Sequence, residues 1–430
     1  MRNNNTSGNK RIKIMIAVLT AACILTFTGC STYSSFSQTF INKPESVTEP
    51  AFTIGVIEPQ SGKNAERGKA EIKGIELANS IYNNVDGYKV NLVKVDTQST
   101  VGATETAIQA LIEMKPVAII GSCGDASSLA ITDYIDDAQI PTITPSATNP
   151  LITQNSAYYF RACLTESQMG EGLAEYAYNA LGSTKIGVVS IKNDTSTSAL
   201  LDGFYSKIRE LAGKKSKAIA ASAEITSDEE EMKKALRDIR SAGVDVCFVS
   251  MGAEEMDTFF TNAEAMGLKG VTFLGTKSWG DEAFISMMSK HNGIKVVFPY
   301  ETVLSKPGDS EDSQSEEGQK FRIEYASRYG DADIPTDNAA LGYDSYLLLI
   351  NAIHNAKALE GPAIREAIWN FDGLKCATGV FSFDKTGNVV RSVTLATIRD
   401  GKAVLEYTTD SEAQAKRLEE IENEGVGSNQ

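Results

Sequence analysis

Residues 52–83 read FTIGVIEPQSGKNAERGKAEIKGIELANSIYN, a short apolar run followed by a polar turn and a longer amphipathic segment. The run Phe52–Ile57 predicts a buried strand, because a short apolar segment bounded by turn residues suits a strand covered on both faces. The segment Arg67–Asn83 predicts a helix. A strand that leads into a helix is the first half of a βαβ unit, in which helices connect parallel strands.

The chain repeats this alternation in two series. In the first series we expect further strands at 89–96, 117–120 and 141–144, and helices at 101–114 and 127–138. In the second series we expect strands at 185–190, 218–225, 244–250 and 271–275, and helices at 199–211, 228–242, 254–266 and 281–289. Later segments predict helices at 318–329 and 338–358 and hairpin strands at 379–383, 392–398 and 403–407. Two series predict an α/β protein with two doubly wound parallel sheets.

The first thirty residues have the features of an export signal. Basic residues between Arg2 and Lys13 precede the apolar stretch Ile14–Leu25, which is shorter than the ~20 residues that a membrane span needs. The following Thr28-Gly29-Cys30 resembles the lipobox at which bacterial signal peptidase II cuts after lipid modification of the cysteine. This pattern predicts a lipoprotein signal peptide. A signal without lipidation, or an uncleaved anchor, is the alternative.

On this interpretation residues 1–29 are the signal peptide and Cys30, carrying the lipid, is the first mature residue. Residues 30–51 are polar and rich in Ser and Thr, which predicts a flexible spacer. The mature protein would then be held by its lipid on the extracytoplasmic face of the cell membrane.

Composition excludes several classes of function. The net charge of −15 argues against nucleic acid or an anionic membrane surface as a partner, because both require basic patches. The six cysteines show neither disulfide-scaffold nor zinc-site spacing, and only two histidines are present. The sequence also lacks the GxSxG, HExxH and GxxxxGK[ST] motifs. We therefore predict no catalytic residues, no metal and no cofactor.

Several motifs follow one another in a specific order. They are IGVIEPQSG at 54–62, Gly68, GIELA at 74–78, IIG at 119–121, IPTITPSATNP at 140–150 and Phe160-Arg161. In this order they resemble the type I periplasmic binding proteins of the leucine/isoleucine/valine-binding branch, which are the substrate-binding lipoproteins of ABC importers. The resemblance covers nearly the whole mature chain.

The resemblance implies two lobes whose strands present their carboxyl ends to a shared cleft, where open α/β sheets bind ligands. Chain crossings near Glu166, Pro299 and Leu374 would form a three-strand hinge, with Glu166 as a hinge residue, and closure would bury the ligand. The implied segments are an N-terminal lobe of 52–165 and 299–374, a C-terminal lobe of 166–298 and 375–408, and an acidic tail of 409–430.

The resemblance also assigns ligand contacts in the first lobe. The serine that holds the ligand carboxylate in the family's amino-acid binders corresponds to Asp125, which Ala126 and Ser127 follow. The family's pair of a backbone carbonyl and a threonine falls on Ser146 and Thr148. Asp125 is open to two interpretations, a ligand contact or a helix N-cap.

Other positions differ more strongly from the family. Two positions that are often aromatic fall on Arg67 and Thr195, and the acidic partner of the ligand ammonium falls on Lys277. Arg67 is alternatively a rim charge, and Lys277 alternatively projects into solvent. Trp279 is either a core residue or a flat surface on which a ligand stacks.

These differences bear on the ligand. An α-amino acid in the usual orientation would place its carboxylate beside Asp125 and its ammonium beside Lys277, and a buried charge without a partner is costly. We therefore expect a small polar ligand other than leucine, isoleucine or valine. Alternatively, Asp125 and Lys277 pair with each other and leave Ser127, Ser146 and Thr148 to hold an ordinary amino acid.

The predicted function is that of a solute-binding lipoprotein that delivers a small molecule to an ABC permease and its ATPase. Its ligand would be an amino acid, an amino-acid-like molecule, an amide or an organic acid. A ligand sensor that serves a signalling partner is a second hypothesis, and an extracytoplasmic enzyme on the same scaffold is a third.

Overall fold

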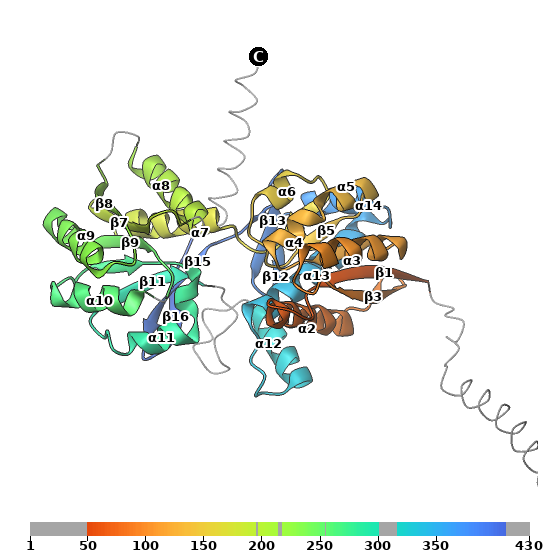
Figure 1. Ribbon diagram of the computed structural model, residues 1–430. Coiled ribbons are helices and arrows are strands. Elements are labelled where there is room, and N and C mark those ends of the chain that lie inside the picture. The colour runs from red at the N-terminus through yellow and green to blue at the C-terminus, as the bar shows by residue number, and fades with distance from the viewer. Residues whose placement is uncertain (1–49, 195–196, 214–216, 254, 301–315, 410–430) are drawn as a thin grey trace, which may run out of the picture. The chain divides into compact units, whose positions relative to one another are not determined.

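The computed structural model describes residues 50–194, 197–213, 217–253, 255–300 and 316–409 (Figure 1). The signal peptide, the lipid site at Cys30, position Thr195 and the tail beyond Thr409 lie outside these residues. From Ala51 on, the described residues belong to one compact unit. No helix among them combines the length and the apolar character that crossing a membrane requires.

The first sheet has the strand order β2-β3-β1-β4-β5-β6. Its neighbours pair in parallel except for β2 with β3, as the strand–helix alternation predicts. Its strands are β1 (Ala51–Glu58), β2 (Asn84–Val85), β3 (Tyr88–Asp96), β4 (Ala118–Gly121), β5 (Thr142–Thr144) and β6 (Tyr159–Arg161). Its helices are α2 (Ala65–Ile81), α3 (Val101–Glu113), α4 (Asp125–Ala130), α5 (Thr132–Ala138), α6 (Leu151–Gln154), α12 (Glu316–Tyr329), α13 (Asp337–Ala356) and α14 (Gly361–Trp369). The predicted helix 127–138 is therefore two helices, with Ile131 between them.

Helix α13 packs closely against α2, and two glycines allow this approach. A Cβ atom at Gly74 would lie 1.8 Å from the Ala339 carbonyl oxygen, and one at Gly342 would lie 2.2 Å from the Glu71 carbonyl oxygen. Side chains larger than hydrogen would push the two backbones apart. This contact places the N-terminus of α13 beside the first turns of α2, where both helices help to line the cavity described below.

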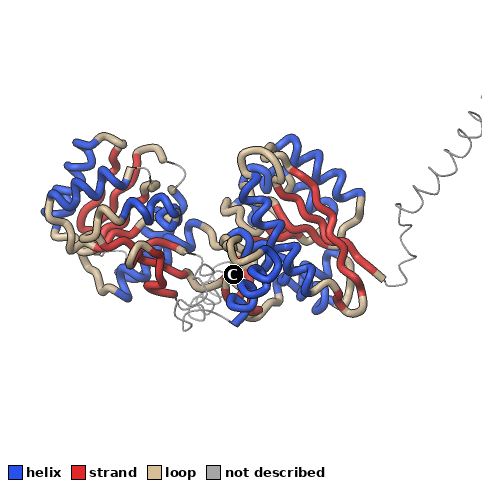
Figure 2. Tube along the Cα trace, turned by 90° about the horizontal axis from the view of Figure 1, so that it is seen from below, coloured by secondary structure: helices blue, strands red, loops and turns tan. Residues whose placement is uncertain are grey.

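The second sheet has the order β16-β15-β11-β10-β9-β7-β8. Strands β8, β7, β9, β10 and β11 are parallel neighbours, and β15 and β16 extend the sheet in antiparallel fashion. The strands are β7 (Ile186–Ile191), β8 (Ile219–Ile225), β9 (Val246–Ser250), β10 (Thr272–Leu274), β11 (Lys295–Pro299), β15 (Thr394–Arg399) and β16 (Lys402–Thr408). The helices are α7 (Glu166–Glu175), the π-helical turn η1 (Tyr176–Ala180), α8 (Ser198–Ala212), α9 (Glu229–Ala242), α10 (Met256–Ala265), the 3-10 turn η2 (Lys277–Gly280) and α11 (Glu282–Met288). Figure 2 shows helices on both faces of each parallel sheet.

A small antiparallel sheet joins the C-terminal part of the chain to the first sheet. It contains β12 (Leu374–Cys376), β13 (Gly379–Phe383) and β14 (Val389–Val390). The buried Asp344 carboxylate of α13 accepts the backbone N–H groups of Ala377 at 2.7 Å and Thr378 at 2.8 Å. Residues 374–390 thus pack on elements of the first sheet, and the chain passes to β15 over residues 391–393. This crossing lies after the boundary between 374 and 375 that the sequence analysis expects.

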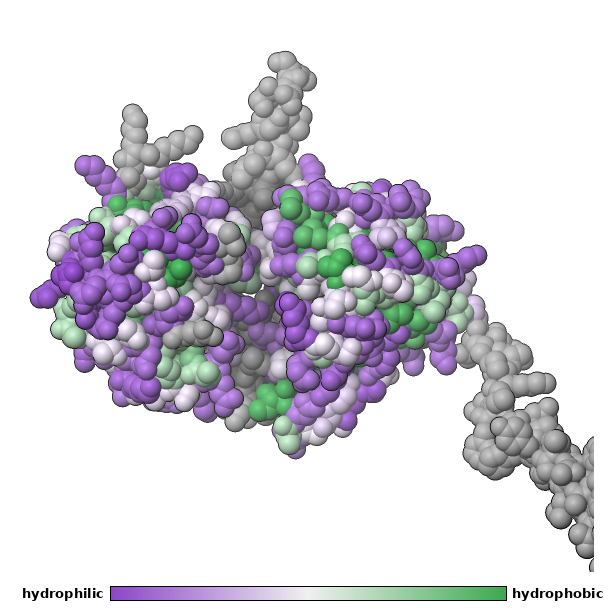
Figure 3. Space-filling view, viewed as in Figure 1, coloured by the Kyte–Doolittle hydropathy of each residue, from purple (hydrophilic) through white to green (hydrophobic). Residues whose placement is uncertain are grey.

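The face shown in Figure 3 is mostly hydrophilic, with apolar patches scattered over it. The cysteines in the described residues, Cys123, Cys163, Cys247 and Cys376, are buried free thiols.

Candidate ligand-binding site

A cavity of about 520 Å³ lies among loops at the carboxyl ends of strands from both parallel sheets. Ser146 and Thr148 follow β5, Lys277 follows β10 and Tyr300 follows β11. The chain passes from strand to helix at these ends, so polar side chains of several loops converge on one space. The charged residues that line the cavity are Arg67, Lys277, Asp281 and Asp337. The hydroxyl-bearing ones are Ser146, Thr148, Ser278, Tyr300 and Thr336.

Arg67 lies in the first turn of α2 and is held against the loop after β5. Its Nε donates to Ser146 Oγ at 3.0 Å, and its Nη2 donates to the Ser146 carbonyl oxygen. Its side chain retains 41% of its exposure, whereas Ser146 is buried. The site therefore has one fixed cationic group on its wall, at a position that the sequence analysis assigns to the ligand contacts.

Asp125 braces a loop. Its Oδ1 accepts the backbone N–H groups of Thr148 at 2.7 Å and Asn149 at 3.1 Å. It is the first residue of α4, and Gly124 is the N-cap. The N-cap interpretation of Asp125 is therefore wrong, because its carboxylate caps a different segment.

The neighbours of Asp125 also face away from the cavity. Ser127 is buried, and its Oγ accepts a hydrogen bond from Thr104 Oγ1 at 3.1 Å. Ala126 is exposed. None of Asp125, Ala126 and Ser127 is among the described residues that line the cavity. The expected direct contacts of these three residues with a ligand thus have no counterpart there.

Lys277 lines the cavity and approaches an acidic residue of α13. Its Nζ lies 3.7 Å from Asp337 Oδ2. The Asp125 carboxylate is engaged with the loop after β5, and the described ion pairs do not include one between Asp125 and Lys277. The alternative in which these two residues pair with each other across the closed cleft stays a prediction.

Trp279 is a core residue, and the interpretation as a ligand-stacking surface is wrong. Its side chain is 0% exposed, its ring stacks on Phe284 at 5.0 Å between centroids, and its Nε1 donates to the Met251 carbonyl oxygen at 3.1 Å. The ring folds back over Gly275, where a Cβ atom would lie 2.2 Å from it. Glycine at this position gives the indole access to the core.

Glu166 lies where the chain passes from the first sheet to the second. It is the first residue of α7, directly after the capping box that Thr165 forms with Gln168. Burial raises the pKa of Glu166 to about 7, and the nearby carboxylates of Asp125 and Asp194 add to this shift. Its role as a hinge residue stays a prediction.

The sequence predicts helix α13 but not that its N-terminus lines the cavity. Thr336 is the N-cap and its side chain accepts the Ala339 N–H at 3.3 Å, while Asp337 and Asn338 line the cavity. A Thr-Asp pair ahead of a long apolar helix is a recognisable start signal. It indicates a helix end, but nothing in it indicates that this end faces the loops after β5 and β10.

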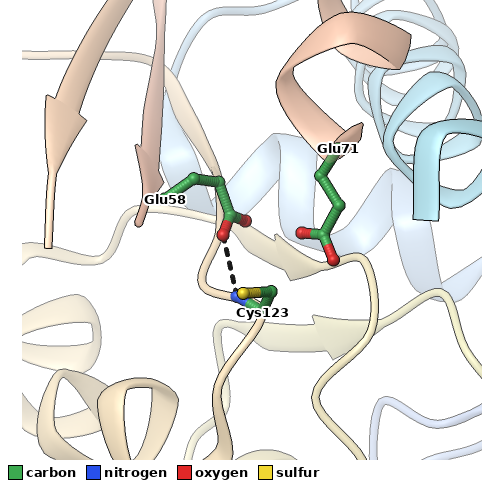
Figure 4. A group of neighbouring side chains, drawn as sticks. All are labelled: Glu58, Glu71 and Cys123. Carbon is green, nitrogen blue, oxygen red and sulfur yellow. Dashed lines mark hydrogen bonds between the residues drawn. The ribbon is translucent and has the colours of Figure 1, made fainter. Parts of the chain in front are cut away.

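A buried acidic pair, Glu58 and Glu71, lies beside Cys123, as Figure 4 shows. Glu58 ends β1, Glu71 lies on α2, and both side chains are 0% exposed. Cys123 N donates to Glu58 Oε2 at 2.9 Å, and Ser146 Oγ donates to Glu71 Oε1. Burial raises the pKa of both carboxyls, that of Glu71 to about 7. One oxygen of each carboxyl and the Cys123 Sγ lie within 4.8 Å of one another, a spacing that could hold a metal ion.

Comparison with known proteins gives concordant matches. The model of a family described as periplasmic binding protein matches residues 51–403. An amino acid binding protein of Pseudomonas aeruginosa is 28% identical over 200 residues, which are 45% of this chain and 52% of that protein. The match therefore spans about half the length of this relative.

Solved structures share the fold. A leucine binding protein, LivK, from Thermotoga maritima superposes with a TM-score of 0.64 at 24% identity, over 84% of this chain and 100% of its own. A solute binding protein of an ABC transporter from Rhodopseudomonas palustris, in complex with 3,4-dihydroxybenzoic acid, has a TM-score of 0.60 at 20% identity. That match covers 84% of this chain and 98% of the other. The expected α/β class with two parallel-sheet lobes is thus confirmed.

Proposed function

The chain belongs to the periplasmic binding protein family, as the sequence resemblance predicts, and from this premise we propose that it is the solute-binding lipoprotein of an ABC importer. It binds a small polar molecule in the cavity lined by Arg67, Ser146, Thr148, Lys277 and Asp337. The cavity is the observation that carries the proposal. It lies at the strand ends where this class of fold binds ligands.

The chemistry of the lining favours a ligand with both acceptor and donor groups. Arg67 and Lys277 offer positive charge, Asp281 and Asp337 offer negative charge, and hydroxyl groups lie between them. A zwitterion such as an amino acid matches this arrangement, and so does an organic acid or amide that uses only part of it. The related proteins with leucine and with 3,4-dihydroxybenzoic acid in their descriptions cover the same range of chemistry.

Two contacts support including leucine, isoleucine and valine among the candidate ligands. These amino acids would be disfavoured if Asp125 repelled the ligand carboxylate and Lys277 repelled the ligand ammonium. The Asp125 carboxylate accepts hydrogen bonds from the backbone N–H groups of Thr148 and Asn149. The Lys277 ammonium lies beside the Asp337 carboxylate. We therefore include branched-chain amino acids among the candidate ligands.

Transport requires partners outside this chain. We propose that Cys30 carries the lipid anchor on the extracytoplasmic face, that 30–51 is the spacer, and that an ABC permease with its ATPase receives the ligand. Support comes from the lipobox-like Thr28-Gly29-Cys30 and from the family match. The lobes would close about crossings near Glu166, Pro299 and residues 391–393, as binding proteins with hinged domains do.

A thermal-shift panel of amino acids, organic acids, amides and nucleobases tests the proposal. A ligand at about 100 times its dissociation constant stabilises the folded state by about 2.7 kcal/mol, which gives a clear rise in melting temperature. The bound molecule should be recovered unchanged after the protein is denatured. Conversion of the ligand during incubation would point to the enzyme hypothesis, and a panel without any shift would contradict this ligand range.

A further inference from the structure

We propose that Glu58 and Glu71 hold one proton between them, and that this pair is the positioning group that fixes Arg67 and Ser146 at the cavity wall. The inference rests on the proposed function in one respect, namely that the cavity wall is part of a ligand site. Its geometry lies entirely within the first sheet and α2, and its test needs no ligand.

The first observation is that each carboxyl has one oxygen engaged and one without a partner. Glu58 Oε2 accepts the Cys123 N–H, and Glu71 Oε1 accepts the Ser146 hydroxyl. Glu58 Oε1 and Glu71 Oε2 accept no hydrogen bond from any described residue, although both are buried. Buried polar atoms nearly always have a hydrogen-bond partner, so these two oxygens require a hydrogen-bond donor.

A single proton satisfies both oxygens. If Glu58 is protonated on Oε1, it donates to Glu71 Oε2, and Glu71 keeps its negative charge. Two neighbouring buried carboxylates cannot both remain ionised, because desolvation and mutual repulsion act in the same direction. Figure 4 shows the two carboxyl groups facing each other, and one oxygen of each lies within 4.8 Å of the other.

The groups around the pair support one retained negative charge. Arg67 on α2 has its Nε 3.8 Å from Glu71 Oε1, which favours the ionised form of Glu71. Glu58 acts electrostatically on the Cys123 thiol and the Tyr159 hydroxyl, and burial raises the pKa of both above their ordinary values. These two groups are therefore neutral.

The chain of contacts runs from the pair to the cavity. Ionised Glu71 accepts from Ser146 Oγ, Ser146 Oγ accepts from Arg67 Nε, and the Ser146 carbonyl accepts from Arg67 Nη2. Glu71 thereby sets the rotamer of Ser146, and Ser146 sets the direction of the guanidinium. Glu58 stabilises this state because its proton forms a hydrogen bond with the second carboxylate oxygen of Glu71.

A divalent cation is the competing occupant. Two features weigh against it. A structural zinc site has four protein ligands, whereas the described cluster offers three. The Arg67 guanidinium also lies next to the cluster and would repel a metal ion.

Four isosteric or conservative variants of the full chain separate these roles. Glu58→Gln replaces the shared proton with a permanent amide donor, and Glu71→Gln removes the charge that orders Ser146. Glu66→Gln is the matched control, since Glu66 lies on the same helix with a 95% exposed side chain. Arg67→Lys assigns the Arg67 signal in spectra of protein labelled with ¹⁵N-arginine.

The first measurement is the infrared carbonyl band of protonated carboxyl groups at about pH 7, where ordinary glutamates are ionised. The band should lose intensity in Glu58→Gln and keep it in Glu66→Gln. Equal spectra for wild type, Glu58→Gln and Glu66→Gln would overturn the shared proton.

The second measurement is exchange of the Arg67 Nε–H with water. We expect exchange to be about tenfold faster in Glu71→Gln, which loses a hydrogen bond to a charged group, and unchanged in Glu58→Gln and Glu66→Gln. Unchanged exchange in Glu71→Gln would overturn the positioning role. A rise in melting temperature with Zn²⁺ or Cd²⁺ in the wild type that is absent in Glu58→Gln would assign the site to a cation instead.

Discussion

Asp125 holds Thr148 in place, because its Oδ1 accepts the Thr148 backbone N–H at 2.7 Å. Asp125 is the first residue of α4, which follows β4, whereas Thr148 lies in the loop after β5, and only Thr148 of the two lines the cavity. An acidic side chain can therefore shape the wall of the cavity without lining it. The same carboxylate also accepts the Asn149 N–H, so the loop is fixed at two consecutive residues.

Replacing Asp125 should loosen this loop. We expect Asp125→Ala to lower the free energy of unfolding by about 1–3 kcal/mol, because two N–H groups lose a charged acceptor. Asp125→Asn should cost less, since its amide oxygen can still accept. Chemical denaturation measures both, with Asp133→Ala on α5 as an exposed control. Equal stability of Asp125→Ala and Asp133→Ala would contradict the bracing role.

The Lys277–Asp337 pair predicts a different profile. Its lysine is 42% exposed, and ion pairs with exposed partners contribute about 0–1 kcal/mol to stability. We expect Lys277→Met to change the melting temperature little but to weaken any ligand that carries a carboxylate. A titration of that ligand by calorimetry measures the second effect. Full affinity in Lys277→Met would remove Lys277 from the ligand contacts.

Trp279 should behave as a core residue in fluorescence. The chain contains two tryptophans, so Trp369→Phe leaves Trp279 as the single emitter. Its full burial predicts a blue-shifted emission that acrylamide quenches poorly and that ligand binding does not change directly. Strong quenching would show that the ring is accessible to solvent.

Truncation of the same residue tests its energetic role. Trp279→Ala should lower the free energy of unfolding by about 3–5 kcal/mol, because it leaves a large cavity between Phe260 and Phe284. Trp279→Phe should lower it much less. Similar costs for the two substitutions would argue that packing is not what Trp279 contributes.

The sequence predicts the strands and helices well because each segment is specified by the pattern of its own residues. The run Phe52–Ile57 and the turn before α2 specify a strand and a helix by their own pattern. The class of fold and the family follow from the order of such segments. The place of Ser146 and Thr148 at the cavity also follows, because strand ends converge in this architecture.

The roles of Asp125, Trp279 and Glu58 depend on distant partners and could not be read from neighbouring residues. Asp125 meets backbone groups 23 and 24 residues away, and Glu58 meets a backbone N–H 65 residues away. Trp279 enters the core because Gly275 leaves room for its ring. In each case the sequence shows the type of residue, but its contact partner is set by the tertiary structure and is distant or unmarked in the sequence.

The lipid anchor is tested at Cys30. The thiol is the group that would be modified, so Cys30→Ser should block lipidation and leave an unprocessed or soluble protein. Partition into detergent on phase separation, together with the apparent mass, measures both properties. A processed Cys30→Ser protein that still enters the detergent phase would contradict lipidation at this residue.

The pH dependence of stability follows from buried carboxyls. Burial raises the pKa of Glu58 well above its ordinary value of 4.5, and raises that of Glu166 from 4.5 to about 7. Between these values the folded protein still binds protons that the unfolded chain has released, so the unfolded state binds fewer protons. The free energy of unfolding must therefore fall as pH rises from about 5 to about 7.

Glutamine variants should identify which carboxyl is responsible for this fall. Glu166→Gln should flatten part of the pH profile, because the neutral amide has no proton to lose beside the nearby carboxylates of Asp125 and Asp194. Glu66→Gln, on an exposed site, should leave the profile unchanged. Urea unfolding at several pH values provides the measurement. A wild-type free energy of unfolding that rises over this interval would show that Glu58 and Glu166 lose their protons at the ordinary pH despite their burial.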